Sequence, residues 1–461
     1  MQYMSTRGDT KTVSFADACL AGLAPDGGLY TPVEYPKLAP ASGKESYTDI
    51  ATRVLSAFAG DSISEADVQT LVAKAYASFA HQSVTPLSEI GPDQWLLELH
   101  HGPTLAFKDV AMQIIAQFYD HLLAERGQRL TVLCATSGDT GGAAAAAFAG
   151  LESVDVFILH PHERISPIQR RFMTSTGASN VHNFALDGDF DESQAIVKAL
   201  FADQTFRQDV RLSGVNSINW TRIAAQSVYF ATAQAALGSE RKLRFVVPTG
   251  NFGDALAAYV AARCGLLNGL EIVSAVNANR TMVDLMETGK LSKRAAHATH
   301  SPAMDIALPS NAERLLFEVM QRDTDQLRNF YNQFAQSGAA ELSDQARGAL
   351  GCVGVKAVSI DDGETEAEMK RLYQETGTLQ CPHTAVGTAA ARATRDASAD
   401  SVDVILSTAH AAKFPETVEA ITGHTPALPE RSESWLARDE VFERLPSDLN
   451  AVREAIRERV S

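Results

Sequence analysis

The chain has 461 residues, of which 45% are hydrophobic and 21% are charged, a composition typical of globular proteins that fold as two or three domains. The formal net charge of −16 argues against nucleic acid or a membrane surface as a partner, and no uninterrupted apolar stretch is long enough to span a membrane. The five scattered cysteines form no C-x-x-C pair, which argues against a zinc site or a disulfide framework and favours a cytoplasmic protein.

The N-terminal part of the chain, residues 1–92, combines turn-rich segments with a helical stretch near Tyr47 to Ala59. It lacks the strand–helix alternation of the residues that follow, so we expect a separate N-terminal domain here. Beyond residue 425 the sequence becomes strongly charged, and residues 426–461 are predicted to form a C-terminal helical appendage.

Between residues 93 and 425, short apolar runs rich in β-branched residues alternate with turns and helical patterns. The runs are LTVLCA (130–135), VDVFILH (154–160), RFVVP (244–248), EIVSAVN (271–277) and VDVILS (402–407). This alternation predicts an α/β fold in which parallel strands are covered by helices on both faces. In such a fold, ligands bind at the edge of the sheet where the carboxyl ends of the strands lie.

The stretch HHGPTLAFKD (100–109) places Lys108 immediately before a helical pattern that covers residues 109–126. The positive end of a helix dipole and partial burial both disfavour an ammonium group, so both lower the pKa of a lysine at this position. A neutral amine can form an imine with a carbonyl compound. Taken alone, the local sequence favours a simpler interpretation, in which Lys108 is a surface cation or pairs with Asp109.

Two Gly-rich loops follow predicted strands and precede predicted helices. TSGDTGG (136–142) offers hydroxyl groups and backbone N–H groups at a helix N-terminus, which suits a carboxylate or a phosphate. The alternative is an ordinary helix cap formed by Ser137 or Asp139. PTGNFGD (248–254) repeats the arrangement and matches neither a P-loop nor a dinucleotide-binding turn. Two such loops at one edge of a sheet predict two sites for anions.

Two further segments carry polar side chains toward the same edge. NSINWTR (216–222) ends in Arg222, which could bind a phosphate through two hydrogen bonds or could lie with its stem over Trp220. LSTAHAAKF (406–414) ends the last predicted strand, and a hydroxyl there could bond to a ring nitrogen or cap the next helix. An imine-forming amine, two anion sites and a partner for a ring nitrogen are together what pyridoxal phosphate and its substrate require.

Metal sites and serine-nucleophile motifs are not indicated. DGDFD (187–191) begins like a calcium loop but has Glu192 where glycine is needed, so we expect it to cap a helix. The histidines at 100–101 and 160–162 lack the spacing of a zinc-binding helix, and the chain contains no G-x-S-x-G turn.

A series of motifs occurs in the order and approximate spacing of one enzyme family: YMSTRG, GLAPDGGLYTP, HGPTLAFKD, TSGDTG, NSINWTR, PTGNFGD, PHTAVG and LSTAHAAKF. On these motifs the chain resembles the threonine synthase family, within the fold type II pyridoxal-phosphate enzymes related to the tryptophan synthase β-subunit. The resemblance is to the longer bacterial and fungal branch. It implies two open parallel-sheet lobes over residues 93–425, with a mobile smaller lobe at roughly 120–210, in addition to the N-terminal domain.

The resemblance also assigns roles to individual residues. It implies that Lys108 forms the imine with pyridoxal 5′-phosphate and is the catalytic base. The residues implied at the cofactor phosphate are Gly250, Asn251, Phe252, Gly253 and Asp254, and those at the pyridine nitrogen are Thr408 and Ser407. The residues implied at or near the substrate carboxylate are Thr136, Ser137, Gly138, Asp139 and Thr140, and those at the substrate phosphate are Asn216, Ser217 and Arg222.

The implied reaction converts O-phospho-L-homoserine and water into L-threonine and phosphate, the last step of threonine biosynthesis. One alternative is another fold type II lyase, such as a threonine or serine dehydratase, which needs no second anion site; a non-catalytic relative is another. The chain departs from the family at Cys381, where many relatives have aspartate, and at Ala411, where proline is common. Asp139 replaces the asparagine that other fold type II enzymes use near the ring oxygen. A monomer and a homodimer both remain open.

Overall fold

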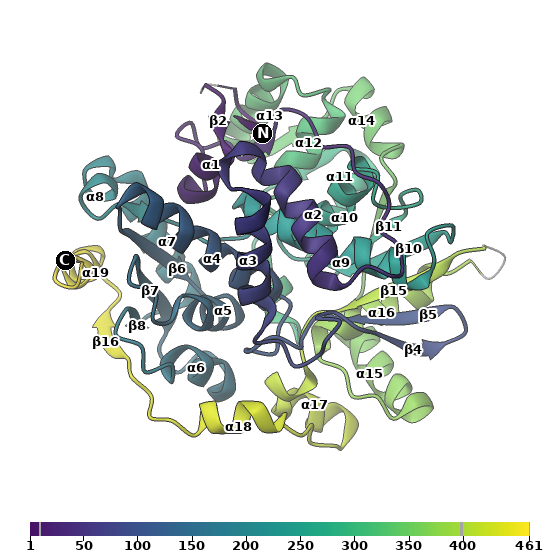
Figure 1. Ribbon diagram of the computed structural model, residues 1–461. Helices are drawn as coiled ribbons and strands as arrows, with labels where there is room; N and C mark the ends of the chain where they lie inside the picture. Colours follow the sequence, from purple (N-terminus) through teal and green to yellow (C-terminus); the bar gives the residue numbers. More distant parts are fainter. Residues whose placement is uncertain (9–10, 397–399, 461) are drawn as a thin grey trace.

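The computed structural model describes residues 1–8, 11–396 and 400–460 (Figure 1). Two mainly parallel β-sheets, each covered by helices, form two lobes, and an N-terminal unit packs against the helices between them. The predicted α/β fold with parallel strands is confirmed. The strands in the middle of both sheets are buried along their whole length, which explains why they are continuous apolar runs in the sequence.

The N-terminal unit consists of a three-stranded antiparallel sheet followed by helices. Its elements are β1 (Gln2–Ser5), β2 (Val13–Ser14), α1 (Phe15–Ala21), β3 (Tyr30–Pro32), α2 (Tyr47–Ala59), η1 (Gly60–Ser62) and α3 (Glu65–Tyr76). The helix expected near Tyr47 to Ala59 is present with those bounds as α2. Ser46 and Asp49 form a capping box at its start, and Gly60 ends it.

The larger lobe contains a six-stranded sheet in the order β14-β11-β10-β15-β5-β4. Its strands are β4 (Leu87–Gly91), β5 (Gln94–Glu98), β10 (Leu243–Pro248), β11 (Ile272–Val276), β14 (Val355–Ser359) and β15 (Val402–Ser407). Only the β4–β5 pair is antiparallel. The boundary expected at residue 92 therefore lies in the turn of a hairpin that belongs to this sheet, because β4 does not pair with the N-terminal unit.

Helices and one short hairpin complete the larger lobe. The elements are α10 (Gly253–Arg263), α11 (Thr281–Thr288), β12 (Lys290–Ser292), η2 (Pro302–Met304), α12 (Ala312–Val319), α13 (Thr324–Ser337), β13 (Ala339–Glu341), α14 (Asp344–Gly351), α15 (Asp362–Thr376), α16 (Pro382–Thr394), η3 (Ala411–Lys413) and α17 (Pro415–Thr422). Two long helices, α4 (Lys108–Arg126) and α9 (Trp220–Leu237), lie between the lobes, and the N-terminal helices α2 and α3 pack on them.

The smaller lobe contains a five-stranded sheet, every neighbouring pair of which is parallel. Residues 130–213 supply β6 (Leu130–Ala135), α5 (Asp139–Phe148), β7 (Val154–Pro161), α6 (Pro167–Thr174), β8 (Val181–Asp187), α7 (Phe190–Ala202), α8 (Gln204–Asp209) and β9 (Leu212–Ser213). Asp189 caps α7 with a capping box, as expected for DGDFD.

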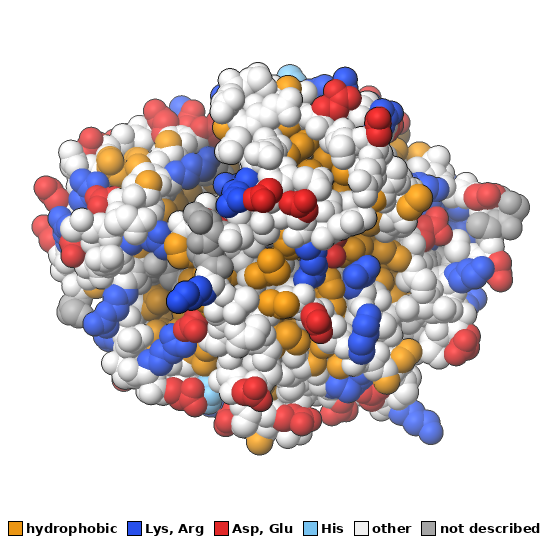
Figure 2. All heavy atoms as spheres, turned by 90° about the horizontal axis from the view of Figure 1, so that it is seen from above, with side chains coloured by type: hydrophobic (Ala, Val, Ile, Leu, Met, Phe, Trp, Pro, Cys, Tyr) orange, Lys and Arg blue, Asp and Glu red, His pale blue; other side chains and the backbone are white. Residues whose placement is uncertain are grey.

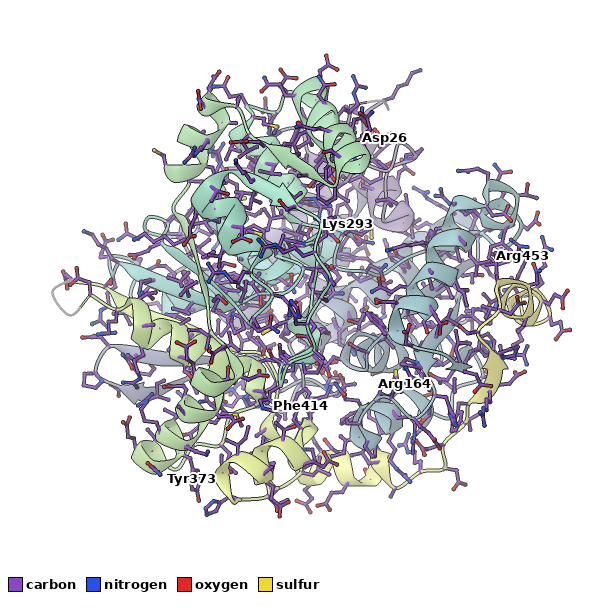
Figure 3. All side chains as sticks on the ribbon, turned by 180° about the vertical axis from the view of Figure 1, so that it is seen from behind. Asp26, Arg164, Lys293, Tyr373, Phe414 and Arg453 are labelled. Atoms are coloured by element: carbon purple, nitrogen blue, oxygen red, sulfur yellow. The ribbon has the colours of Figure 1, made fainter. Side chains whose placement is uncertain are left out.

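The C-terminal segment supplies the fifth strand and is not entirely helical. It forms α18 (Glu430–Leu436), β16 (Glu443–Pro446) and α19 (Leu449–Arg457), and β16 pairs in parallel with β8. The strand could not be predicted from side-chain pattern, because it is a largely exposed edge strand held through its backbone. In Figure 1 this segment runs along the outside of the smaller lobe from α17 past α6. Arg453 on α19 lies at the outer edge (Figure 3) and donates to Asp203 at 3.0 Å.

The surface carries charges of both signs. Figure 2 shows Lys and Arg side chains interspersed with Asp and Glu over one face of the molecule, so positive charge is not concentrated on that face. Within the described ranges, no helix is both long enough and apolar enough to cross a bilayer.

Because α19 contributes to the core of the smaller lobe, we expect Ile456→Ala to destabilise that lobe. Ile456 is fully buried with Phe184 and Leu200, and truncating such a side chain costs about 2–5 kcal/mol. Urea unfolding and limited proteolysis of the smaller lobe would measure the loss. Glu454→Ala, on the exposed side of the same helix, should leave both measurements unchanged.

Candidate active site

The candidate site lies where β6, β10 and β15 end and where α4 begins. Lys108 is the first residue of α4. The segment before it is tied to the loop after β15, because Phe107 N–H donates to the Thr408 carbonyl at 2.7 Å and His410 N–H donates to the Leu105 carbonyl at 3.0 Å. The segment before Lys108 is therefore bonded to a segment from near the other end of the chain, and this pairing holds Lys108 in place.

Lys108 is not a surface cation. Its side chain is 12% exposed, and its Nζ lies 3.3 Å from Asp139 Oδ2. Burial lowers the pKa of Lys108; the negative charge of Asp139 opposes this shift, and the positive charges of Lys413 and Arg222 add to it. The suggested pairing with Asp109 does not occur.

Asp109 instead accepts hydrogen bonds from the backbone N–H and the hydroxyl of Thr104, both at 2.7 Å. Burial raises the pKa of Asp109 to about 6. This carboxyl group therefore shapes the turn before α4 and leaves the Lys108 amine to face Asp139.

In the loop TSGDTGG, Thr136 is the residue that satisfies the start of α5. Its Oγ1 accepts from the N–H groups of Gly138 at 2.9 Å and Gly141 at 3.0 Å, so neither Ser137 nor Asp139 is the cap that the sequence suggested. Gly138 has a φ of +135°, and a Cβ there would lie 2.7 Å from the side chain of Gln169. Only glycine fits this turn.

Three side chains of this loop have different surroundings. Asp139 points inward, 2.8 Å from the Nζ of Lys413 and 3.0 Å from the Nε2 of Gln169. Ser137 and Thr140 are partly exposed, and their hydroxyl groups form no side-chain hydrogen bond within the described part of the chain. Of the hydroxyls in this loop, those two are the ones available to a ligand.

The loop after β10 is shaped by close backbone contacts. Phe252 has a φ of +61°, and α10 begins at the next residue. A Cβ on Gly250 would lie 2.8 Å from the Ala303 carbonyl oxygen, and one on Gly253 would lie 3.3 Å from Asn311 Nδ2. Asn251 accepts from the Asn311 N–H at 3.1 Å. The loop therefore brings backbone N–H groups to the start of an 11-residue helix, which suits a phosphate.

Asp254 lies in the first turn of α10 and is buried. The Tyr229 hydroxyl donates to its Oδ1, and its Oδ2 has no partner. Burial raises the pKa of Asp254 to about 7. A carboxyl group that is only about half ionised at neutral pH repels an anion bound at the helix start less than a fully ionised one would.

Arg222 is buried near the Lys108 amine. It is 3% exposed, its Nη1 donates to the Val215 carbonyl at 3.3 Å, and its Nε has no partner. Burial lowers the pKa of Arg222 to about 10, and it stays charged at neutral pH. The guanidinium group that lies over the Trp220 ring is that of Arg314, at 5.4 Å, whereas the guanidinium group of Arg222 donates to the Val215 carbonyl.

The residues just before Arg222 are held from the larger lobe. Ser217 accepts through its carbonyl from Asn311 Nδ2 at 3.1 Å. Asn216 and Ser217 are partly exposed. Asn311 therefore joins this segment to the loop after β10, and the two predicted phosphate-binding segments are neighbours.

The end of β15 carries a buried hydroxyl without a partner. Thr408 Oγ1 is buried and forms no hydrogen bond, whereas its N–H donates to Thr384 Oγ1 at 3.2 Å. Ser407 is the last residue of the strand and accepts through its carbonyl from Leu99 N–H. Of the two hydroxyl residues, Thr408 has the unsatisfied side chain.

Cys381 is the N-cap of α16, beside Thr408. Its Sγ accepts from the Thr384 N–H at 3.4 Å and lies 3.2 Å from the Thr384 hydroxyl. Burial raises the pKa of the thiol. The cysteine thus caps this helix in the manner of the aspartate that the family pattern has there.

Sequence reasoning gave no role to several residues that meet at the site. His383 accepts through Nε2 from the Ala303 N–H at 3.1 Å, and its Nδ1 is buried without a partner. Burial lowers the pKa of His383 to about 4. Lys413, Asn311 and Arg314 were also missed. His383 and Lys413 lie in the motifs PHTAVG and LSTAHAAKF, whereas Asn311 and Arg314 lie in none of the motifs, and only the folded chain brings all four together.

Family models match nearly all of the chain. A model of the threonine synthase N terminus matches residues 2–76, a model of pyridoxal-phosphate dependent enzymes matches residues 80–408, and a model of the threonine synthase C-terminal region matches residues 384–456. Threonine synthase from Pseudomonas aeruginosa is 42% identical over 459 residues, which cover 98% of this chain and 97% of the relative. The chain belongs to the threonine synthase family.

Solved structures agree with this assignment. The structure of threonine synthase from Brucella melitensis with bound pyridoxal phosphate has a TM-score of 0.96 and 44% identity, covering 100% of this chain and 99% of that one. A threonine deaminase from Solanum lycopersicum, with a TM-score of 0.53 and 14% identity, covers 89% of this chain and 96% of its own; it shares the fold alone. The resemblance to threonine synthase is confirmed, and the dehydratase alternative has support only from the fold.

The cofactor is pyridoxal 5′-phosphate, and the residues present fit it. Lys108 offers an amine in surroundings that disfavour its ammonium form. The tight loop at Gly250 and the start of α10 offer backbone N–H groups to a phosphate. The unsatisfied Thr408 hydroxyl is suited to a ring nitrogen. Each chemical feature of the cofactor therefore has a fitting group.

The raised pKa of Asp254 predicts a pH-dependent loss of stability in the cofactor-free protein. An unfolded aspartate ionises near pH 4, so the stability linked to this group is present below that pH and is lost as the pH rises through about 7. Asp254→Asn stays neutral and should therefore lose about 1–4 kcal/mol less than the wild type between pH 5 and pH 8. Urea unfolding at each pH measures the difference.

The exposed Asp344→Asn serves as the control for this comparison and should follow the wild type. Parallel stability curves for the wild type and Asp254→Asn would show that Asp254 is already ionised at pH 5.

Proposed function

We propose that the substrate is O-phospho-L-homoserine and that Lys108 is the residue that moves its protons, giving L-threonine and phosphate. The observation that carries this proposal is a buried arginine, Arg222, whose positive charge acts on the buried Lys108 and interacts with Asp254 in the loop after β10. A substrate with both a carboxylate and a phosphate would use both loops, whereas a dehydratase substrate has no phosphate for Arg222 to bind.

Each candidate residue has a role in this proposal. Ser137 and Thr140, assisted by the N–H groups of their loop, bind the substrate carboxylate. Arg222 and Ser217, with Asn216 beside them, bind the substrate phosphate. The loop 250–253 binds the cofactor phosphate. Thr408 bonds to the ring nitrogen and keeps the ring uncharged, because a hydroxyl does not protonate it as a carboxylic acid would.

Pyridoxal phosphate, when bound, withdraws electrons from the α-carbon of an amino acid. The Lys108 Nζ, when neutral, takes the proton from Cα. It must release that proton before it can take a second one from Cβ, because an ammonium group is not a base. Arg222 stabilises the phosphate as it leaves Cγ, because its charge is fixed and desolvated. A proton is then added at Cγ, water is added at Cβ, and a proton returns to Cα, which gives L-threonine. Water must be excluded until it adds at Cβ, so we propose that the smaller lobe closes over the substrate.

The cellular setting follows from the same proposal. An enzyme with this substrate performs the last step of threonine biosynthesis, which we place in the cytoplasm. The scattered cysteines support that compartment, because the four buried ones and the exposed Cys352 are all free thiols.

The reaction is tested by measuring phosphate release from O-phospho-L-homoserine, with O-acetylserine, serine and threonine assayed beside it. We expect release from phosphohomoserine and little turnover of the others. Lys108→Ala should lose the visible absorbance of the covalently bound cofactor and at least about 1,000-fold of the rate. A wild-type protein that deaminates serine or threonine and releases no phosphate from phosphohomoserine would contradict the proposal.

The role of Arg222 is tested by Arg222→Lys, which keeps the charge but cannot form two parallel hydrogen bonds to a phosphate. We expect kcat/KM for phosphohomoserine to fall about 10–100-fold. Binding of unphosphorylated L-threonine, followed through the cofactor absorbance, should be unaffected. An equal loss of phosphohomoserine turnover and of L-threonine binding would mean that Arg222 supports the fold of the site and does not bind the substrate phosphate.

A further inference from the structure

Lys413 is a buried lysine to which the proposed function gives no role. It is the last residue of η3 and follows β15 and Thr408 closely in the chain. Its side chain is 1% exposed. The Nζ lies 2.8 Å from Asp139 Oδ1, donates to the Thr104 carbonyl at 2.7 Å, and lies 5.2 Å from the centre of the Phe172 ring. Phe414, the next residue, is labelled in Figure 3 where the two lobes meet.

Asp139 divides its two oxygen atoms between two lysines. Oδ1 faces Lys413 and also accepts from Gln169 Nε2 at 3.0 Å, whereas Oδ2 faces Lys108 at the longer distance of 3.3 Å. Both lysines are buried, and one carboxylate can balance only one ammonium group. An excess positive charge in a dry site is expensive, so one of the two lysines is driven to lose its proton.

The contacts favour Lys108 as the lysine that loses it. Lys413 has two acceptors, Asp139 and a backbone carbonyl, both within 2.8 Å. Among the described residues, Lys108 has one hydrogen-bond acceptor, Asp139, at the longer distance of 3.3 Å, and its Nζ also lies 4.7 Å from the centre of the Phe107 ring. Ionisation of Lys413 therefore satisfies two strong hydrogen bonds, and ionisation of Lys108 satisfies one weak one.

We propose that Lys413 is a positioning residue that holds Asp139 through Oδ1 and occupies its charge, so that the Lys108 amine is left neutral and oriented toward the reacting atoms. Lys413 touches neither substrate nor cofactor in this scheme and acts only through Asp139. The proposal rests on the proposed function in one respect, which is that Lys108 is the reacting amine.

Other charged groups around Lys108 do not replace this effect. Arg222 from α9 also contributes positive charge, but it forms no ion pair with Asp139. Asp254 from α10 is close to half-neutral at pH 7, and His383 from α16 is neutral there because burial lowers its pKa to about 4. Asp139 is thus the nearest fixed negative charge, and Lys413 determines how much of it reaches Lys108.

The test uses the full-length protein freed of cofactor, and it follows the rate at which added pyridoxal phosphate gives the covalent absorbance band between pH 6 and pH 10. The midpoint of this pH profile reports the ionisation of the reacting amine. In Lys413→Met, Asp139 is left to pair with Lys108 alone, so the midpoint should rise by about one pH unit or more. Lys413→Arg restores the positive charge and should return the midpoint toward that of the wild type.

A second pair of variants keeps the test independent of the folding of Lys413→Met. Asp139→Asn should lower the midpoint, because both lysines then lack the carboxylate. Adding Lys413→Met to Asp139→Asn should raise it again, since the remaining positive neighbour is removed. Lys290→Met, which breaks the exposed ion pair with Glu341, is the control and should leave the profile unchanged.

The outcomes separate this inference from the proposed function. Lys108→Ala that still forms the covalent band would show that another amine reacts, which refutes the role of Lys108. If Lys108→Ala abolishes the band while the midpoint is the same with Met or Lys at position 413, in both the wild-type and Asp139→Asn backgrounds, Lys413 is only structural and the inference is overturned.

Discussion

The interaction on which the rest of this structure depends is a buried carboxylate shared by two buried lysines. Asp139, Lys108 and Lys413 belong to α5, α4 and η3, and more than 300 positions separate the two lysines in the chain. Ions taken out of water cost several kcal/mol each unless their partners are in place. The contact is therefore stable only when α5 of the smaller lobe lies against the ends of β15 and the start of α4. The packing of the two lobes against each other and the formation of the site therefore depend on the same contact.

The N-terminal unit also helps to hold the site residues in place, although it lies outside the site. Arg314, which is fully buried, donates to the carbonyl groups of Tyr30 and Ile218 and to the side chain of Asn311. Its neighbour Glu313 pairs with Arg7 at 2.9 Å. The first strands of the chain are thus bonded to the segment that leads into Arg222. The N-terminal unit therefore supports the expected phosphate pocket from outside, through the Tyr30 carbonyl and the Arg7–Glu313 ion pair.

Much of this arrangement could be predicted from the sequence, because it depends on local patterns. The bounds of α2, β6 and β15 match the expected ones. The two Gly-rich loops do not lie at one edge of a single sheet as expected, because β6 and β10 belong to the sheets of different lobes. What could not be predicted depends on distant partners. The Thr136 hydroxyl accepts from the N–H groups at the start of α5, whereas the Asp139 side chain pairs with lysines on other elements. Lys413 is an ordinary basic residue in its own segment, and only the tertiary contact with Asp139 distinguishes it. The strand β16 has no apolar pattern, because its partner recognises its backbone.

The strand β16 also bears on how the protein is made. It completes the sheet of the smaller lobe with residues 443–446, and α19 then fills the core of that lobe with Val452 and Ile456. A ribosome exposes these residues after every other described strand of both sheets has emerged. The smaller lobe must therefore wait, with an open edge and part of its core uncovered, until residues 443–456 emerge. The larger lobe can complete its folding earlier, so the two lobes of each molecule reach their native structures at different times.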